Sequence, residues 1–218
     1  MIHLANGDLA LDLDPALGML ATSLRFRDGE LLAPARARRD EVVRVDTLRG
    51  MALLAPWASR LPGDRYEAEG RVVDLTALPI ERDEQGRPLH GTLTGRGEWV
   101  VLEQRADVLV AAVDLYRDPV TATAFPFSAR IQVEWRLTGD ALEVTTALFA
   151  TDRGLVPACF GWHPYLVLPD ADRGACRVRI LGGEAAPIGD ATVDTLVAVG
   201  EDRTAVLTGA RRTLTLTL

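Results

Sequence analysis

Two histidines lie in settings that suit acid–base chemistry. His90 falls in the segment 86–91, where glycine and proline indicate a loop rather than a core position. His163 falls in the segment 160–166, where Pro164 favours an extended backbone and aromatic residues crowd the ring. Imidazole has an ordinary pKa of about 6.5, so either side chain can transfer a proton near neutral pH. A surface or structural role is the alternative for each histidine.

Arg60 is a candidate ligand-binding residue. It follows Trp57 and Ser59 and precedes a proline and a glycine, a setting typical of a polar loop. A guanidinium can donate two hydrogen bonds to neighbouring oxygens of one ligand. The alternative is a salt bridge at the surface.

The sequence lacks the signatures of several other active sites. The histidines have no HxH, HExxH or cysteine-cluster context, so we predict no metal site. Glu67 and Glu69 lie two residues apart on an expected strand, which is typical of a solvated face rather than of a glycosidase pair. Cys159 and Cys176 are expected to be reduced and buried, and no oxyanion site accompanies Cys159 to make it a nucleophile.

Composition and charge exclude further classes of partner. The 218 residues carry a net charge of −7 with the arginines scattered among acids, so no basic stripe is available for nucleic acid. The start of the chain has no signal-peptide pattern, and no stretch of about 18 uninterrupted apolar residues occurs. We therefore expect a cytoplasmic protein with no membrane partner and one domain over residues 1–218. No oligomeric state follows from these features.

The elements that must hold the candidate residues are predicted to be strands. Apolar and polar residues alternate with period two along much of the chain, as in strands with one buried face. The best helical spacing, at 17–24, is weakened by a glycine and a nearby proline, so a strand is favoured there too. The expected fold class is all-β, a sandwich or barrel-like fold. The expected strands and hairpins span residues 9–14, 25–32, 42–46, 71–75, 99–104, 108–115, 131–137, 142–148, 176–181, 195–199, 205–207 and 213–218.

Four segments in a fixed order resemble the aldose 1-epimerase (galactose mutarotase-like) family. They are residues 56–61, 89–91, 125–127 and 161–166, and they cover nearly the whole chain. The resemblance implies an antiparallel β-supersandwich that interconverts the α and β anomers of free hexoses such as galactose and glucose. It also implies a small-molecule sugar as the substrate and no cofactor.

The resemblance implies a role for each matching residue. His163 matches the acid that protonates the ring oxygen of the sugar, and His90 matches the histidine that binds the substrate and steadies charge developing on oxygen. Ser59 stands where the family usually has an asparagine, which weakens or rearranges one hydrogen bond to the sugar. The implied substrate-binding residues are Ser59, Arg60, Trp162, Tyr165 and Asp194, and core packing is the alternative for the aromatic residues.

The general base is the main departure from the family pattern. The family's glutamate base lies beyond a strand that resembles residues 213–218, so no residue of this chain is assigned as the base. Because that strand alternates up to the last residue, we expect the natural chain to continue beyond it. Two alternatives follow: a non-catalytic carbohydrate-binding domain, or a hexose-6-phosphate 1-epimerase. The second needs a cationic phosphate clamp, for which the sequence offers Arg38, Arg39, Arg65 and Arg87 without an evident cluster.

Overall fold

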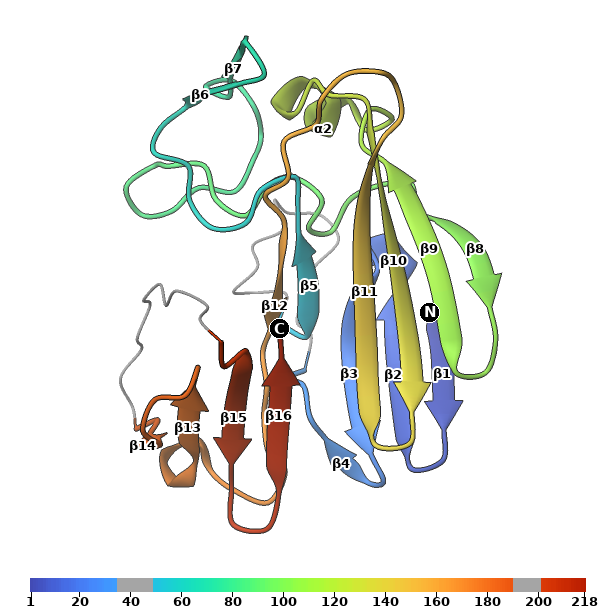
Figure 1. Cartoon of the computed structure of the whole chain (residues 1–218), viewed down its shortest axis with the longest axis vertical. Helices are drawn as coiled ribbons and strands as arrows, with labels where there is room; N and C mark the ends of the chain where they lie inside the picture. The colour runs from blue at the N-terminus through green and yellow to red at the C-terminus, as the bar shows by residue number, and fades with distance from the viewer. Residues whose placement is uncertain (35–48, 190–200) are drawn as a thin grey trace. The chain divides into compact units, whose positions relative to one another are not determined.

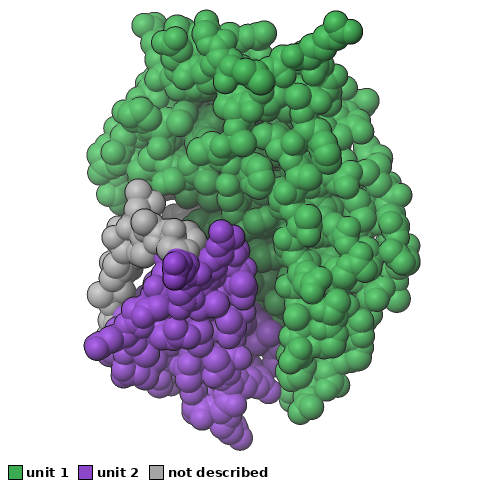
Figure 2. All heavy atoms as spheres, in the orientation of Figure 1, with its two compact units in different colours: residues 1–28, 32–166 green, residues 29–31, 167–218 purple. Residues whose placement is uncertain are grey.

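The computed structural model describes residues 1–34, 49–189 and 201–218. The chain divides into two compact units, which Figure 2 shows in different colours: residues 1–28 with 32–166, and residues 29–31 with 167–218. One domain over residues 1–218 stays a prediction. The predicted strands at 42–46 and 195–199 lie outside the described residues, as does Asp194.

The first sheet of the larger unit is antiparallel, in the order β1-β2-β3-β5-β12 (Figure 1). The alternation predicted at its second strand is confirmed, because Leu9, Leu11 and Leu13 are buried there. The segment at 17–24 contributes to a strand rather than to an α-helix, as the sequence favours. The bounds are β1 Ile2–Asn6, β2 Leu9–Asp14, β3 Leu20–Phe26, β5 Met51–Leu54 and β12 Gly161–Pro164.

The second sheet of this unit has the order β11-β10-β9-β8 and is also antiparallel. The predicted hairpin of residues 131–137 and 142–148, which forms one edge of this sheet, is confirmed: Ile131, Val133, Trp135 and Leu137 share the buried face. The bounds are β8 Val100–Gln104, β9 Val108–Asp114, β10 Ala129–Thr138 and β11 Ala141–Ala150.

Aromatic packing joins the two sheets into a sandwich. The fully buried ring of Trp135 on β10 meets the ring of Trp162 on β12, with centroids 6.2 Å apart in an edge-to-face arrangement. The indole N–H of Trp162 donates to the hydroxyl of Thr146 on β11 at 3.0 Å. The side-chain amide of Asn6 donates to the backbone carbonyl of Leu137 at 2.8 Å. The apolar core therefore lies between the two sheets.

A short helix, α2 (Pro119–Ala124), was not anticipated from the sequence. Asp118 caps it, since its side chain accepts the backbone N–H of Thr121 at 2.8 Å, and proline occupies the first turn. Among the described residues of this unit, the other helical element is the 3₁₀ turn η1 (Pro15–Leu17). Both are too short to show a helical repeat in the sequence.

A two-stranded hairpin, β6 (Arg65–Ala68) and β7 (Arg71–Asp74), carries a small core of its own. The hydroxyl of Tyr66 donates to the backbone carbonyl of Ala124 at 2.7 Å, and burial raises the pKa of Tyr66 to about 12. The buried residues of this cluster are Trp57, Val73, Leu75, Ile80 and Ala124.

The smaller unit holds a sheet of order β14-β13-β15-β16. The strands predicted at 176–181, 205–207 and 213–218 are confirmed here. Cys176 is buried, but the expectation of burial is wrong for Cys159 in the larger unit, which is exposed. The bounds are β4 Gly29–Glu30, η2 Arg173–Ala175, β13 Arg177–Ile180, β14 Ala186–Pro187, β15 Thr204–Thr208 and β16 Thr213–Thr217.

The all-β, antiparallel prediction is thus confirmed for the described ranges. Within those ranges, no helix is long and apolar enough to cross a membrane.

Candidate functional site

Strand β12 places His163. It pairs with β5 so that His163 lies opposite Ala52, and the next backbone N–H, that of Tyr165, donates to the carbonyl of Gly50 at 2.8 Å. Neighbouring side chains on a strand point to opposite faces. Because Trp162 faces the core between the sheets, His163 faces the other side of its sheet.

A loop held by backbone hydrogen bonds places His90. Its N–H donates to the carbonyl of Ser59 at 2.9 Å, while Thr92 donates to the carbonyl of Ala55 at 2.8 Å. His90 has a left-handed backbone with φ of 59°, which is uncommon for a residue with a side chain. Gly91 is also left-handed, and a Cβ atom there would overlap the carbonyl of Ala55, so only glycine fits. The loop is therefore tied closely to the chain just before Arg60.

The two histidine rings meet. Their centroids are 5.5 Å apart and their planes are inclined by 79°, in an edge-to-face arrangement. Tyr165 stacks on His163 from another side, with centroids 4.8 Å apart and planes inclined by 29°. The structure thus brings together three of the residues singled out from the sequence: His90, His163 and Tyr165.

Arg60 lies beside the histidine loop and is held by a carboxylate. Its backbone forms an antiparallel bridge with Leu89, the residue before His90. Its Nε–H donates to Oδ2 of Asp83 at 3.2 Å, and the Asp83 side chain is only 5% exposed. Burial acts to raise the pKa of Asp83, but hydrogen bonds from Arg87 outweigh it and hold that pKa at about 2. Asp83 is therefore ionised and anchors the arginine.

The remaining predicted residues differ in how the structure places them. Ser59 lies at the site through its backbone, since its carbonyl accepts the N–H of His90. Trp162 points into the sandwich core and donates its indole N–H to Thr146, which favours the packing alternative, so its contact with sugar stays a prediction.

Two carboxylates near the histidine loop were missed by the sequence reasoning. Asp83 holds Arg60, and Glu81 is a buried residue whose backbone carbonyl accepts the N–H of Leu89 at 2.9 Å. The one feature of the sequence that could have indicated them is their position, since both lie between the candidate arginine and the candidate histidine. Across the part of the chain that the structure describes, no group of three His, Cys, Asp or Glu side chains could hold a metal ion.

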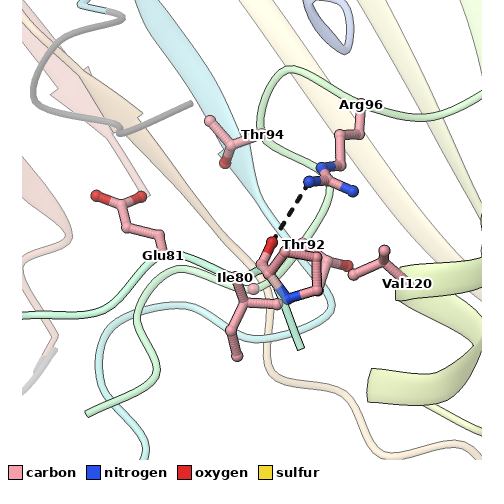
Figure 3. A pocket seen from close by; sticks show the side chains of 8 residues that line it. Ile80, Glu81, Thr92, Thr94, Arg96 and Val120 are labelled. Atoms are coloured by element: carbon pink, nitrogen blue, oxygen red, sulfur yellow. Dashed lines mark hydrogen bonds between the residues drawn. The ribbon is translucent and has the colours of Figure 1, made fainter. Parts of the chain in front are cut away.

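A small cavity is lined by Gly91, the residue after His90, and by Glu81, which Figure 3 labels. Thr92, Thr94 and Arg96 also line it, and Arg96 donates to the backbone carbonyl of Pro79 at 3.4 Å. Its volume is about 20 Å³, enough for roughly one water molecule. Pockets for small-molecule ligands are typically about 300–1,000 Å³, so this cavity is not the place where a sugar binds.

Known proteins resemble this chain in sequence or in fold. The uncharacterized protein YphB of Escherichia coli K12 is 28% identical over 170 residues, which are 78% of this chain and 53% of that protein. The chain therefore spans about half the length of the curated relative that it matches. The structure is similar to a galactose mutarotase-like protein from Lactobacillus casei ATCC 334, with a TM-score of 0.68, 16% identity, and coverage of 100% of this chain and 79% of that one.

A second solved structure leads to the same fold. A galactose mutarotase-like protein from Clostridium acetobutylicum has a TM-score of 0.67 and 16% identity, over 82% of this chain and 55% of that one. The galactose mutarotase-like fold expected from the sequence is thus confirmed. The sequence model of the family described as aldose 1-epimerase matches residues 33–210, which is most of the chain. The chain belongs to the aldose 1-epimerase family.

Proposed function

We propose that the protein is an aldose 1-epimerase that interconverts the α and β anomers of free hexoses such as galactose and glucose by acid–base ring opening. The observation that carries the proposal is the contact between His90 and His163. Two segments far apart in the sequence bring these imidazoles to a centroid distance of 5.5 Å. Membership of the family supports the class of reaction, and the choice of free hexoses rests on the resemblance of the site residues.

The geometry of the pair supports a division of roles. Two imidazolium charges at this separation would repel each other, so the proposal gives a positive charge to only one of the two rings. The charged ring, for which we propose His163, donates a proton to the ring oxygen of the sugar as the C1–O5 bond breaks. His90 hydrogen-bonds the substrate and stabilises charge that develops on oxygen. Rotation about C1–C2 and reclosure then deliver the other anomer.

The loop beside His90 supplies the proposed sugar-binding groups. The side chain of Arg60 is 36% exposed, so we propose that its guanidinium reaches sugar oxygens while Asp83 holds its Nε–H. The hydrogen bond from His90 to the carbonyl of Ser59 fixes the binding arginine relative to the histidine. Asp194 remains a proposed ligand of the sugar hydroxyls. The anomeric hydroxyl loses its proton to a carboxylate base, for which we propose no residue.

Polarimetry on freshly dissolved α-galactose and α-glucose tests the proposal. The protein should bring the optical rotation to equilibrium faster than the spontaneous reaction does. His163→Asn should lower the catalysed rate by roughly 10²- to 10⁴-fold, the usual contribution of a general acid. His3→Asn is the matched control, because His3 lies on β1 and bonds Asp12 rather than either site histidine.

Other results would contradict parts of the proposal. An unchanged rate in His163→Asn would exclude its role as the acid. Activity on hexose 6-phosphates but only the spontaneous rate on free sugars would overturn the substrate class. Saturable binding of sugars without any acceleration would show a carbohydrate-binding domain instead of an enzyme.

A further inference from the structure

Three segments of chain lie side by side around the histidine loop. The segment 59–61 pairs with 88–90, as Leu61 donates its N–H to the carbonyl of Pro88 at 3.0 Å. On the other side, the segment 81–83 pairs with 87–89, as Leu89 donates to the carbonyl of Glu81 at 2.9 Å. The segment that leads to His90 is thus the middle one. Arg60 and Asp83 belong to the two outer segments.

Asp83 reaches across the middle segment and links its neighbours. Its Oδ1 accepts the backbone N–H groups of Gln85 at 3.0 Å and Arg87 at 2.9 Å, which closes the turn at 83–87. Its Oδ2 accepts the Nε–H of Arg87 at 2.8 Å and the Nε–H of Arg60 at 3.2 Å. Ionic hydrogen bonds to a side chain that is 5% exposed are shielded from water and are stronger than neutral ones. One carboxylate therefore orients two guanidiniums.

We infer that Asp83 is a positioning residue, which fixes the guanidinium of Arg60 in the orientation that receives the substrate by accepting its Nε–H across the histidine-bearing segment. A guanidinium is planar, so fixing the Nε–H also fixes the plane in which the terminal nitrogens lie. The long side chain of a free arginine loses conformational entropy on binding, and a side chain that is already held loses less. Asp83 thereby favours substrate binding without contacting the substrate. The inference rests on the proposed function, in which Arg60 binds the sugar.

The alternative is that Asp83 only closes its own turn, and Asp74 provides a matched comparison. Asp74 accepts the N–H of Thr76 at 2.9 Å and the Nε–H of Arg65 at 2.9 Å, in the same local pattern. Hydrogen bonds from Thr76, and then from Arg65, also hold its pKa at about 2. Arg65 lies on the β6–β7 hairpin and makes no bridge to the histidine loop. Asp74→Asn therefore removes a carboxylate charge and a turn contact without affecting Arg60, although the Asp74 side chain is more exposed, at 45%, than that of Asp83.

The experiment compares Asp83→Asn, Asp74→Asn, Arg60→Gln and the double variant Asp83→Asn/Arg60→Gln. Asparagine keeps an oxygen that can close the 83–87 turn but removes the charge that holds Arg60. We expect Asp83→Asn to raise the KM for galactose, and the Kd by titration calorimetry, roughly tenfold with a much smaller change in kcat. Asp74→Asn should match the wild type. In the Arg60→Gln background, Asp83→Asn should have no further effect.

Several outcomes overturn the inference. If the fold-changes in Kd of the two single variants multiply in the double variant, Asp83 acts independently of Arg60. If Asp83→Asn and Asp74→Asn change the Kd equally, the cause is a general loss of charge. If Asp83→Asn does not fold, Arg60→Lys serves instead, because lysine keeps the charge and leaves the turn at 83–87 intact but lacks a planar Nε–H. Wild-type sugar affinity in Arg60→Lys would then contradict the inference.

A second measurement separates this inference from the proposed function. NMR relaxation of the Arg60 ¹⁵Nε group reports the mobility of the guanidinium whether or not the protein binds sugar. Asp83→Asn should increase that mobility and Asp74→Asn should leave it unchanged. A wild-type protein that neither binds nor converts sugars would refute the proposed function alone, whereas an Arg60 that stays ordered in Asp83→Asn would refute the positioning role.

Discussion

The two histidines of the site are held in opposite ways. His163 lies on β12, whose backbone pairs with β5 and whose far face packs against Trp135 through Trp162. His90 lies in a loop with a left-handed backbone, held by one hydrogen bond to Ser59 and by the close approach of Gly91 to Ala55. One residue depends on the core of the sandwich, and the other on local backbone geometry. Substitutions should therefore separate global stability from the geometry of the site.

The largest effect is expected for Trp135→Ala. The fully buried ring packs behind β12, and removing a buried tryptophan side chain typically costs about 3–5 kcal/mol. The packing of Trp135 against Trp162, which holds the strand that carries His163, should be lost as the protein unfolds. Urea denaturation followed by circular dichroism measures this change. Val72→Ala, at a side chain that is 71% exposed, is the control and should have little effect.

Gly91→Ala should perturb the His90 loop instead. The added Cβ would overlap the carbonyl of Ala55, and the residue also has a φ of 74°. Gly70→Ala is the matched control, with a φ of 70° and open space around the Cβ position. Gly91→Ala should destabilise the protein by about 1–3 kcal/mol more than Gly70→Ala, the usual cost of overpacking.

The same pair tests the site itself. Sugar affinity should fall in Gly91→Ala at a temperature where the variant is still folded, and should not change in Gly70→Ala. Equal stabilities for the two variants would show that the loop adapts without strain, and the contrast between the two histidines would then be wrong.

Acid should reduce the stability of the protein by protonating two carboxylates, Asp83 beside the His90 loop and Asp74 in the β6–β7 hairpin. Each carboxyl has a pKa of about 2 in the folded protein and an ordinary pKa of 3.8, so the unfolded chain takes up protons first as the pH falls. The stabilisation is present above about pH 4 and is lost between about pH 4 and pH 2. Asp83→Asn and Asp74→Asn should each flatten the fall in stability over that window. Urea midpoints from pH 5 down to about pH 2 measure it, and wild-type slopes in both variants would contradict the assignment.

The smallest effect is expected at Tyr66, in the β6–β7 hairpin. Its pKa is raised from 10.0 to about 12, so the folded protein holds the phenolic proton more tightly than the unfolded chain does. The contribution of this protonated phenol to the free energy of unfolding is present below about pH 10 and is lost as the pH rises toward 12. Tyr66→Phe should therefore show a flatter loss of stability in alkali, at the cost of one hydrogen bond to Ala124. An ultraviolet titration with a midpoint near the ordinary value would contradict the shift.

The sequence predicts the sheets well where one face of a strand is buried. Residues 131–137 alternate strictly, and they pair with residues 142–148 in the hairpin at one edge of the second sheet. The sequence does not predict α2, because a six-residue helix begun by Asp118 and Pro119 has no room for a helical repeat. The signal for that helix is its cap alone.

The site is predictable in part for the same kind of reason. Loop composition marks His90, and the following proline and the aromatic neighbours mark His163, which lies on a strand. Their contact depends on the pairing of β5 with β12, which is a long-range property. Asp83 has an ordinary sequence context, and its importance arises only when the segments around it fold side by side. Trp162 is an aromatic residue next to a site histidine, a setting that suggests contact with a sugar ring. In the structure, the alternation of side chains along β12 turns its ring toward the core.

The pairing around the histidine loop also has a consequence for protein engineering. The chain leaves that loop after Leu61 and returns at Glu81, and both points are fastened to neighbouring residues, Pro88 and Leu89. The excursion 62–80, which includes the β6–β7 hairpin, therefore begins and ends at anchored positions. Within the excursion, Val73, Leu75 and Ile80 are buried against Trp57, whereas the tip of the hairpin at Glu69 and Gly70 is exposed. An insertion at that tip should leave Arg60 in place beside His90, which makes the tip the natural place to graft a new recognition element.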